Sequence, residues 1–439
     1  MKIHFASCAL VWLFCCSAQA AIINVPGDQP DIQTAINVAV NGDEIIVAQG
    51  EYFENINFNG KAITVRSTDP NDAFVVLNTI INGGGSGSVV TCSTSEGPGS
   101  VLSGFVITGG SGTVSGPITL GGGMYILNSS PTVKNCSFSG NFVGSFGGGG
   151  MYNENSSPTV TNCTFSGNSG NSGGGMLNNN SSPTMTNCLF SGNTARSGGG
   201  IFNTTSSPTV VNCSFSGNST SGSQSRGGGM YNEGNGNTTV TNCSFSGNSA
   251  ISGGGIYSTS IRLDVINCIL WGDSSTEIII NLLASTVTYS NVQGGFPGLG
   301  NIDADPFFAD PLGPDGTAGT DDDDLRLVAG SPCIDAGNNG AVPVGVTTDL
   351  DGNPRFLDDP NTPDTGAGAA PLVDMGAYEF DPSCPADASG DGFVNVTDLL
   401  LLLGAWGSCP APCPPDINND GNVNVTDLLT LLAGWGACP

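Results

Sequence analysis

The chain has 439 residues, a formal net charge of −28, and charged side chains at only 10% of its positions. This acidic balance disfavours nucleic acid as a partner, because the phosphate backbone would repel the chain. Apolar residues make up 38% of the chain and 67 residues are glycine, which excludes a solvated disordered polymer. We therefore expect a periodic fold that buries the apolar residues.

Residues 1–20 have the pattern of a secretory signal peptide. Lys2 precedes an apolar run at residues 10–16, and residues 18–20 read Ala-Gln-Ala, a small-residue cleavage motif. The run is shorter than the roughly 20 apolar residues of a membrane-spanning helix. We predict cleavage before Ala21, with the mature chain secreted to the extracellular space or attached to a cell surface, and no membrane span. Cleavage would also remove the only histidine, His4, and with it histidine-based acid–base chemistry.

The body of the chain, predicted at residues 21–300, is dominated by a repeat of about 25 residues between positions 121 and 270. Each copy contains Gly-Gly-Gly followed by Met or Ile, then short Thr, Val and Phe runs broken by Gly, Asn and Ser-Ser-Pro turns. One cysteine per copy marks the period, at positions 136, 163, 188, 213, 243 and 268. This period and composition predict an all-β fold, a parallel β-helix solenoid with one copy per coil.

Equivalent positions in stacked coils lie about 4.8 Å apart and share one environment, so each column has one chemistry. Two apolar columns are predicted to point inward: Val133, Val160, Met185, Val210, Val240 and Val265, and Phe138, Phe165, Phe190, Phe215 and Phe245. The odd separation of Val133 and Phe138 predicts a bend near Asn135, with the repeated asparagines stacked as an amide ladder. The repeat cysteines are predicted to be buried free thiols, because Cβ atoms one coil apart exceed the about 3.5–4.5 Å of a disulfide.

Another column follows the Met or Ile position, and it allows two interpretations. If its side chains are exposed, they could stack on sugar rings; if they face inward, they are core. The column consists of Tyr125, Tyr152, Leu177, Phe202, Tyr231 and Tyr257.

Several motifs of the body resemble known β-helix families. The Gly-Gly-Gly-Met/Ile and Phe138–Asn141 motifs resemble the repeats of polymorphic outer-membrane proteins, and residues 32–56 resemble the start of pectin-lyase-like β-helices. The latter resemblance implies an N-terminal capping helix from Ile32 to Val40. Residues 331–337, 349–355 and 374–379 are similar to the closing segment of anchored bacterial right-handed β-helix proteins. Together the resemblances imply a right-handed solenoid with an acidic irregular closing segment at residues 301–381.

After residue 381 a second repeat appears, with Cys384–Asp387 matched by Cys413–Asp416 at an offset of 29 residues. Each copy places oxygen ligands at loop positions 1, 3, 5, 7, 9 and 12, which is the donor set that Ca²⁺ prefers. Position 7 would contribute its backbone carbonyl, and the other positions would contribute side-chain oxygens. The predicted ligands are Asp387, Ser389, Asp391, Phe393, Asn395 and Asp398 in the first loop, and Asp416, Asn418, Asp420, Asn422, Asn424 and Asp427 in the second. An apolar run after each loop predicts one helix per copy, whereas Pro385 and Pro414 hinder a helix before it.

This twofold loop-then-helix pattern at residues 382–439 resembles a type I dockerin. The resemblance implies calcium-dependent docking onto a cohesin-like domain of a scaffold or surface protein. Cys384 and Cys409, and Cys413 and Cys438, are each 25 residues apart, so one disulfide within each copy is the simplest pairing. Four cysteines still allow three connectivities.

Candidate catalytic groups are sparse in the body. Glu154 and Glu233 occupy equivalent positions three coils apart, about 14 Å, whereas a glycosidase pair needs about 5–10 Å. Arg196 and Arg226 have no acidic partner in register, and the Asp321–Asp324 run is expected to be a solvated loop rather than a metal site. No catalytic residue is assigned. The sequence favours a non-catalytic protein that binds polysaccharide or surface partners and is tethered through its dockerin-like module; the alternative is a polysaccharide lyase or glycoside hydrolase of a cellulosome-like complex.

Overall fold

The structure is a computed structural model that describes residues 20–281, 284–382, 386–389, 393–409, 413, 415–418 and 421–437. Apart from Ala20, the predicted signal peptide lies outside these ranges. Within them, no helix combines the length and the hydropathy needed to cross a membrane.

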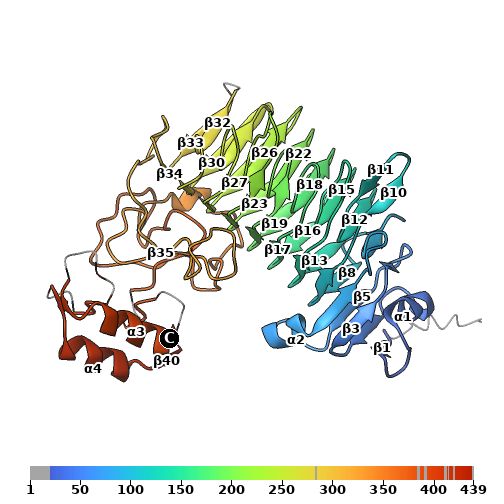
Figure 1. Cartoon of the computed structure of the whole chain (residues 1–439), viewed down its shortest axis with the longest axis horizontal. Coiled ribbons are helices and arrows are strands. Elements are labelled where there is room, and N and C mark those ends of the chain that lie inside the picture. Colours follow the sequence, from blue (N-terminus) through green and yellow to red (C-terminus); the bar gives the residue numbers. More distant parts are fainter. Residues whose placement is uncertain are drawn as a thin grey trace, which may run out of the picture.

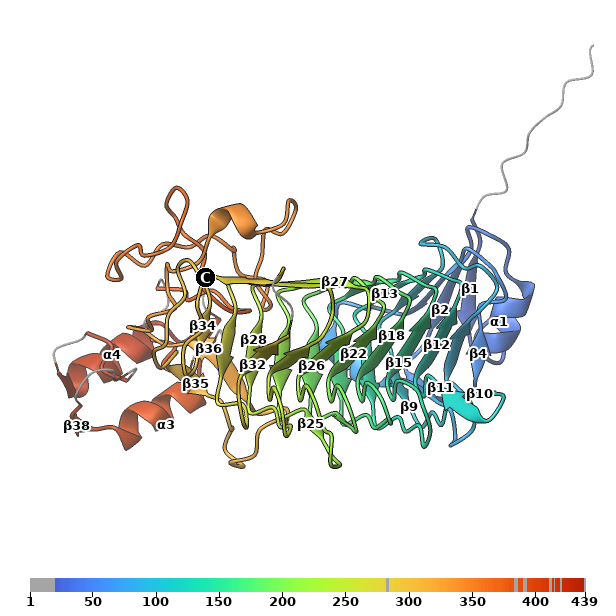
Figure 2. The same cartoon turned by 90° about the horizontal axis from the view of Figure 1, so that it is seen from above.

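Three parallel sheets of 11, 10 and 9 strands form the body in the described part of the chain. Consecutive strands along the chain pass from one sheet to the next, so each full coil contributes one strand to every sheet. Figures 1 and 2 show the coils stacked side by side from the N-terminal end to the closing segment. The predicted all-β parallel solenoid is confirmed, and the structure gives it about 11 turns.

The strands of each sheet follow one another in sequence order. The first sheet contains β1 (Ile22–Val25), β2 (Glu44–Val47), β5 (Thr64–Ser67), β8 (Val101–Ser103), β13 (Thr132–Lys134), β16 (Thr159–Thr161), β19 (Thr184–Thr186), β23 (Thr209–Val211), β27 (Asn237–Thr241), β30 (Arg262–Ile266) and β33 (Thr286–Thr288). The second contains β3 (Gly50–Phe53), β6 (Thr79–Asn82), β9 (Val106–Thr108), β14 (Ser137–Ser139), β17 (Thr164–Ser166), β20 (Leu189–Ser191), β24 (Ser214–Ser216), β28 (Ser244–Ser246), β31 (Ile269–Trp271) and β34 (Asn291–Val292). The third contains β4 (Ile56–Asn57), β7 (Val90–Cys92), β12 (Met124–Leu127), β15 (Met151–Glu154), β18 (Met176–Asn179), β22 (Ile201–Thr204), β26 (Met230–Glu233), β29 (Ile256–Ser258) and β32 (Ile278–Ile280).

Short strand pairs and helices complete the described chain. The pairs are β10 (Thr113–Ser115) with β11 (Ile118–Leu120), β21 (Thr194–Ala195) with β25 (Ser219–Thr220), β35 (Phe308–Asp310) with β36 (Asp324–Leu327), β37 (Phe393–Val394) with β40 (Gly436–Ala437), and β38 (Gly407–Ser408) with β39 (Asn422–Val423). The helices are α1 (Ile32–Val38), α2 (Ala73–Leu77), η1 (Asn339–Ala341), α3 (Val396–Gly404) and α4 (Val425–Ala433).

The solenoid core includes the two predicted inward columns, together with the repeat cysteines and the Met or Ile column of the third sheet. Every member of the Val/Met column and of the Phe column is fully buried. Successive rings from Phe138 to Phe245 stack face to face, with centroids 4.4–4.9 Å apart. Each coil therefore completes the core of its neighbours, which is why the period was sufficient to predict that these two columns are inside.

The bend between the first and second sheets lies at the predicted asparagines. Asn135 and its five equivalents all adopt a left-handed backbone with φ between 50° and 56°, a conformation that asparagine tolerates better than most residues. Their amides bond between coils, as from Asn162 Nδ2 to Asn135 Oδ1 (3.1 Å) and from Asn267 Nδ2 to Asn242 Oδ1 (2.9 Å). The six repeat cysteines are buried free thiols, as predicted.

Helix α1 covers the N-terminal end of the solenoid and buries Ile32, Ala35 and Ile36 in the core (Figure 2). Its first turn is capped by Asp31, which accepts a hydrogen bond from Thr34 N (2.6 Å). The predicted capping helix is confirmed, although it ends at Val38 rather than Val40 because Ala39 is already extended.

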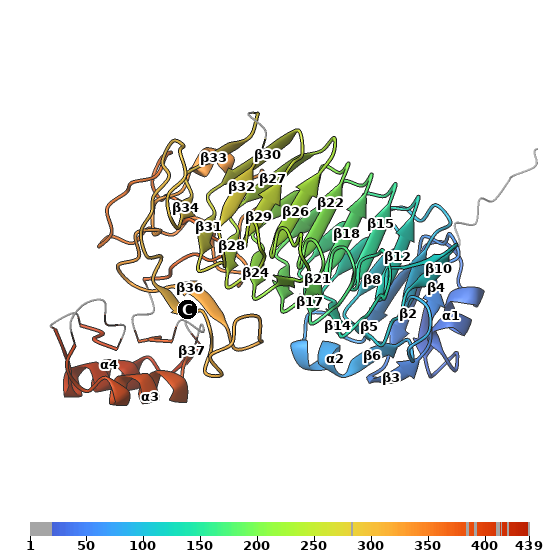
Figure 3. The ribbon, with the colours of Figure 1, turned by 45° about the horizontal axis from the view of Figure 1, so that its top comes forward.

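The closing segment is largely irregular and runs along the flank of the later coils (Figure 3). It is joined to the asparagine bends, with Asn212 Nδ2 donating to Thr348 O (2.7 Å) and Asn267 Nδ2 to Asn338 O (3.1 Å). Ala377 N in turn donates to Ser244 Oγ on the second sheet (3.0 Å). The segment therefore covers part of the outer face of that sheet.

Candidate functional site

The C-terminal module, residues 386–437, contains the predicted calcium loops in front of α3 and α4. Asn395 and Asn424 cap the two helices with their side chains. Asp398 and Asp427, at loop position 12, accept bonds from the backbone N–H of those caps at 2.7 and 2.8 Å. Each capping box thus fixes the last predicted ligand of its loop against the start of its helix.

In the first loop, hydrogen bonds join three of the predicted ligands. Asp398 Oδ1 accepts a bond from Ser389 N (2.8 Å), and Ser389 Oγ donates to Asp387 Oδ1 (3.2 Å). Phe393 belongs to β37, and Asn395 is the residue that caps α3. Asp391 lies outside the described residues.

The second loop repeats this arrangement. Asp427 Oδ1 accepts a bond from Asn418 N (3.2 Å), and Asp416 Oδ2 accepts one from Gly421 N (2.7 Å), a glycine with φ of 85° at the sharp turn. Asn422 and Asn424 precede α4, and Asp420 lies outside the described residues.

The donor set of both loops fits a hard divalent cation. Asp398 and Asp427 are fully buried carboxylates, and the remaining predicted donors are carboxylate, hydroxyl, amide and carbonyl oxygens. Ca²⁺ takes six to eight such oxygens, whereas the thiolates and imidazoles preferred by zinc do not occur among them. The residues present would therefore hold Ca²⁺, which would supply positive charge to the buried carboxylates.

The predicted disulfide pairing is wrong. Cys409 is bonded to Cys413, with their Cα atoms 6.0 Å apart, and not to Cys384. The reason is an exchange of strands between the copies: β38, after α3, pairs with β39 in the second loop, whereas β40, after α4, pairs with β37 in the first. The end of one copy therefore meets the start of the other. Cys384 and Cys438 lie outside the described residues.

Helices α3 and α4 bury one side against each other and expose the other side. Leu402 and Leu431 are fully buried in the module core. Four apolar positions in each copy are instead 49–64% exposed. These positions are Val396 and Val425, Leu400 and Leu429, Leu403 and Leu432, and Trp406 and Trp435. We call these eight residues, four from each copy, the apolar face; a large amount of exposed apolar surface on a soluble protein marks a site of interaction.

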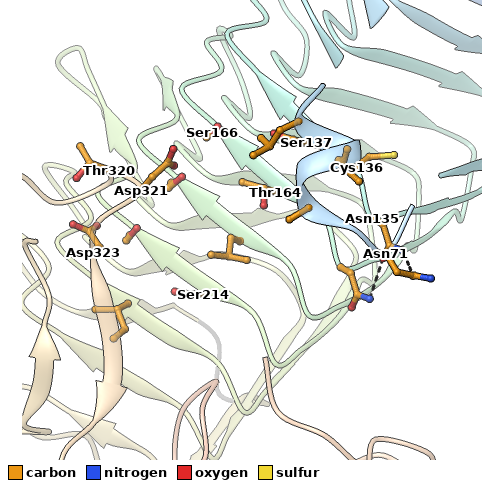
Figure 4. A pocket seen from close by; sticks show the side chains of 18 of the residues that line it. Asn71, Asn135, Cys136, Ser137, Thr164, Ser166, Ser214, Thr320, Asp321 and Asp323 are labelled. Carbon is orange, nitrogen blue, oxygen red and sulfur yellow. Dashed lines mark hydrogen bonds between the residues drawn. The ribbon is translucent and has the colours of Figure 1, made fainter. Parts of the chain in front are cut away.

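A groove of 690 Å³ lies on the outer face of the second sheet (Figure 4). Helix α2 borders one side, where Asn71 accepts a bond from Asn135 Nδ2 (3.0 Å), and the closing segment borders the other with Asp321 and Asp323. The floor is formed by hydroxyl groups that repeat from coil to coil, interrupted in one column by Leu189. They belong to Ser137, Thr164, Ser166, Ser191, Ser214 and Ser216. The described lining residues include no lysine, arginine or histidine.

The aromatic column that could have stacked on sugars is not exposed. Five of its six members are at most 7% exposed and form a cluster of their own outside the third sheet. Tyr125 stacks on Tyr152 with ring centroids 5.9 Å apart, and burial raises the pKa of Tyr152 to about 12. The column is a second core, so the interpretation as a sugar platform is wrong.

Glu154 and Glu233 are three coils apart, as the sequence predicts. The strand register links Glu154 to Asn179, then to Thr204, then to Glu233. Each glutamate accepts a bond from the tyrosine two residues before it, Tyr152 OH at 3.1 Å and Tyr231 OH at 2.9 Å. They therefore stabilise the rim of the aromatic cluster and do not form a carboxylate pair.

The Asp321–Asp324 run is partly solvated and partly structural. Asp321 and Asp322 are exposed, as expected for an acidic loop, whereas Asp323 and Asp324 are half-buried. Asp324 pairs with Arg326 at 3.3 Å, and Asp323 accepts a bond from Gly319 N (2.5 Å).

The structure also shows a buried polar cluster, which sequence reasoning missed. Arg355 is fully buried and forms an ion pair with Glu379 (3.2 Å). Glu379 N donates to Asp349 Oδ2 (2.9 Å), and Asp374 N donates to Glu379 Oε1 (3.1 Å). Asp374 Oδ1 accepts a bond from Asp335 N (2.7 Å). The three motifs of the closing segment therefore converge on one site; the Asp, Arg and Glu residues within these motifs were the available signal.

Sequence reasoning also missed a buried pair of carboxyl groups, Asp273 and Glu277, at the end of a ladder of asparagine side chains. Asn141, Asn168, Asn193, Asn218 and Asn248 bond from coil to coil, and the last of them donates to Asp273 Oδ1 (2.9 Å). Asp273 lies beside Glu277, and both carboxyls are buried. Burial raises the pKa of Asp273 to about 6 and that of Glu277 to about 10. The Phe-Ser-Gly-Asn motif carried the signal for this ladder.

One comparison with known proteins agrees with the architecture. A family model described as right handed beta helix region matches residues 65–228. The body of the chain is a right-handed parallel β-helix. A search of curated proteins finds no match. Among solved structures, the pectate lyase Pel9A aligns with a TM-score of 0.44 and 15% identity, over 83% of this chain and 97% of that chain.

Proposed function

We propose that this chain is a secreted, non-catalytic β-helix protein that is tethered to a scaffold or surface protein through its C-terminal module. The observation that carries the proposal is the apolar face, which is exposed to the same extent in both copies of the module. An exposed patch of leucine, valine and tryptophan is costly in water unless a partner covers it. Its place behind two calcium loops favours a cohesin-like domain as that partner.

Calcium would make this attachment conditional. The predicted loops precede α3 and α4, and the buried Asp398 and Asp427 belong both to the loops and to the helix caps. Filling the loops with Ca²⁺ would neutralise these carboxylates and stabilise the helices that present the apolar face.

The β-helix would carry the second activity, binding of a polysaccharide in the groove on the second sheet. Two columns of serine and threonine hydroxyls, one of them interrupted by Leu189, form its floor, and Asn71, Asn135 and Asp321 border it. These groups are suited to hydrogen bonding with sugar hydroxyls, in a cavity large enough for a small ligand. The buried aromatic cluster has no part in this binding.

Tethering is tested by capture with the immobilised full-length mature chain from extracellular and envelope proteins of the source organism, with Ca²⁺ or with chelator. We expect calcium-dependent capture of a protein with cohesin-like domains, lost in the L400A/L429A variant. The matched control is V114A, which removes a 74% exposed apolar side chain of the body. Capture that is independent of calcium, or equal for all three proteins, contradicts the proposal.

Groove binding is tested on a broad glycan panel with the variant Ser166→Tyr, which narrows the groove. Thr161→Tyr, on the first sheet of the same coil, is the control. We expect binding of a polysaccharide by the wild type and the control, and its loss in Ser166→Tyr. Failure of the wild type to bind any member contradicts this part of the proposal without affecting the tether.

A second candidate function is a polysaccharide-degrading enzyme, lyase or glycoside hydrolase, because Asp321 and Asp323 both line the groove. The same panel distinguishes the two functions. Release of reducing or unsaturated ends that is abolished by Asp323→Asn would establish the enzyme; unchanged polymer length supports the binding protein.

A further inference from the structure

Three carboxylates meet in the closing segment, away from the C-terminal loops and from the groove. Among the described residues, Asp335, Asp358 and Asp364 each offer one oxygen, and these oxygens lie within 4.8 Å of one another. Asp335 belongs to the Ile-Asp-Ala-Gly motif, whereas the other two stand at the ends of a seven-residue loop. Three like charges at this distance repel one another unless a cation joins them.

Asp335 is the buried member of the group, with none of its surface exposed. Its Oδ2 accepts a bond from Asp359 N (3.2 Å), but Oδ1 meets no hydrogen-bond donor among the described residues. A buried carboxylate oxygen without a donor loses its hydration with no compensation. Oδ1 is therefore the atom of Asp335 that is available to an ion.

The surroundings do not supply the missing positive charge. Asp335 N donates to Asp374, which belongs to the polar cluster around Arg355. Arg355 pairs through Nε with Glu379 and donates through Nη2 to the carbonyls of Asp374 and Gly376, whereas its Nη1 meets no acceptor among the described residues. Within the described residues of this cluster, four buried acids face one buried arginine, which favours an added cation.

The loop is held in shape by groups other than the three carboxylates. Asp359 Oδ1 accepts a bond from Asn361 N (3.0 Å), and Asp359 Oδ2 accepts one from Thr362 Oγ1 (2.7 Å). The backbone of Thr365 donates to Asp335 O (3.0 Å). Asp358 and Asp364 are exposed, so an ion can reach the group directly from solvent.

We infer that Asp335, Asp358 and Asp364 bind a divalent cation of the calcium class and thereby fasten the 358–364 loop to the closing segment. Oxygen-only, carboxylate-rich donors select such hard cations over zinc or copper. The site is independent of the proposed tether and would add one ion to those expected in the C-terminal loops.

The test counts bound ions by native mass spectrometry of the full-length mature chain in Ca²⁺. We expect one ion fewer in the D358N/D364N variant than in the wild type. D310N/D315N removes two exposed charges from the same segment and is expected to keep the wild-type count. Equal counts for wild type and D358N/D364N would overturn the inference, whatever the C-terminal loops bind.

A variant with altered C-terminal loops distinguishes an ion bound at this site from ions bound in the loops of the tether. In D387N/D416N, which alters the first ligand of each C-terminal loop, we expect one calcium ion to remain bound. Adding Asp335→Asn, a near-isosteric change, should remove it while the β-sheet circular dichroism stays unchanged. A remaining ion in that folded triple variant would place the ion elsewhere and refute the assignment.

Discussion

The solenoid and the C-terminal module are both built from sequence repeats, but their copies are arranged differently in space. As a result, the repeated phenylalanines of the solenoid are buried, whereas several repeated apolar residues of the module are exposed. In the solenoid each coil is translated along one axis, so a repeated Phe packs on its own equivalents and is fully buried. In the module two copies face each other and exchange strands, so each helix buries one leucine and exposes others at the same positions in both copies. Stacking of translated coils buries the repeated phenylalanines against one another. Pairing of only two copies leaves the apolar face of each copy exposed to solvent.

The largest expected effect on the free energy of unfolding comes from removing one ring of the stacked Phe column of the solenoid. Phe190→Ala should lower the free energy of unfolding by about 3–5 kcal/mol, because the two flanking rings cannot close the cavity. Leu189→Ala, one residue away and 37% exposed, is the control and should have a much smaller effect. Urea unfolding followed by the β-sheet circular dichroism measures both; equal midpoints would mean that the column does not hold the coils together.

In the module, the same test should separate two neighbouring leucines. Leu402→Ala removes a fully buried side chain and should cost about 2–5 kcal/mol. Its neighbour Leu403, half exposed, should tolerate alanine. Helical circular dichroism and the fluorescence of Trp406 and Trp435 report on the module. Concurrent loss of the β-sheet signal in Leu402→Ala would show that module and solenoid unfold as one unit.

Stability should rise as the pH falls from about 7 to about 5 in chelator. Burial raises the pKa of Asp374 to about 7 and that of Asp335 to about 6. In this range the folded chain therefore binds more protons than the unfolded chain, so unfolding releases protons and becomes easier as the pH increases. Each additional proton corresponds to about 1.4 kcal/mol per pH unit. Urea midpoints at pH 5 and pH 7 measure the slope, which Asp374→Asn should flatten; a midpoint that increases with pH would contradict this reasoning.

The smallest effect is expected where the apolar face is removed. The L400A/L429A variant should change the free energy of unfolding by no more than about 0.5 kcal/mol, because both side chains are already in water. Thermal unfolding of the calcium-loaded chain provides the measurement. A clear destabilisation would show that these leucines support the module itself and would weaken their role in docking.

Much of the solenoid was predictable from its repeat. The period, the inward Val and Phe columns, the bend at Asn135 and the free thiols all follow from one coil, because every coil has the same neighbours. The loop ligands were assigned from their spacing alone, and those that the structure describes lie before α3 and α4 or, for Asp398 and Asp427, in the first turn of these helices. Whether they bind calcium stays a prediction.

Other features required the tertiary structure. The sequence allowed the column of Tyr152 to be exposed or buried, and only its packing outside the third sheet decided between them. The bond between Cys409 and Cys413 follows from strands exchanged between copies, which the 25-residue spacing conceals.

The sequence by itself determined the contacts between equivalent residues of neighbouring coils. From these contacts follow the solenoid, its inward Val and Phe columns and its asparagine bends. Only the tertiary structure decided which unrelated segments meet, such as the 335–337 turn, the 358–364 loop and the buried Arg355. The physical reason is that a period fixes contacts between identical neighbours, whereas the closing segment has no period. Its contacts depend on burial and charge balance over the whole segment, which become visible only when the chain is folded.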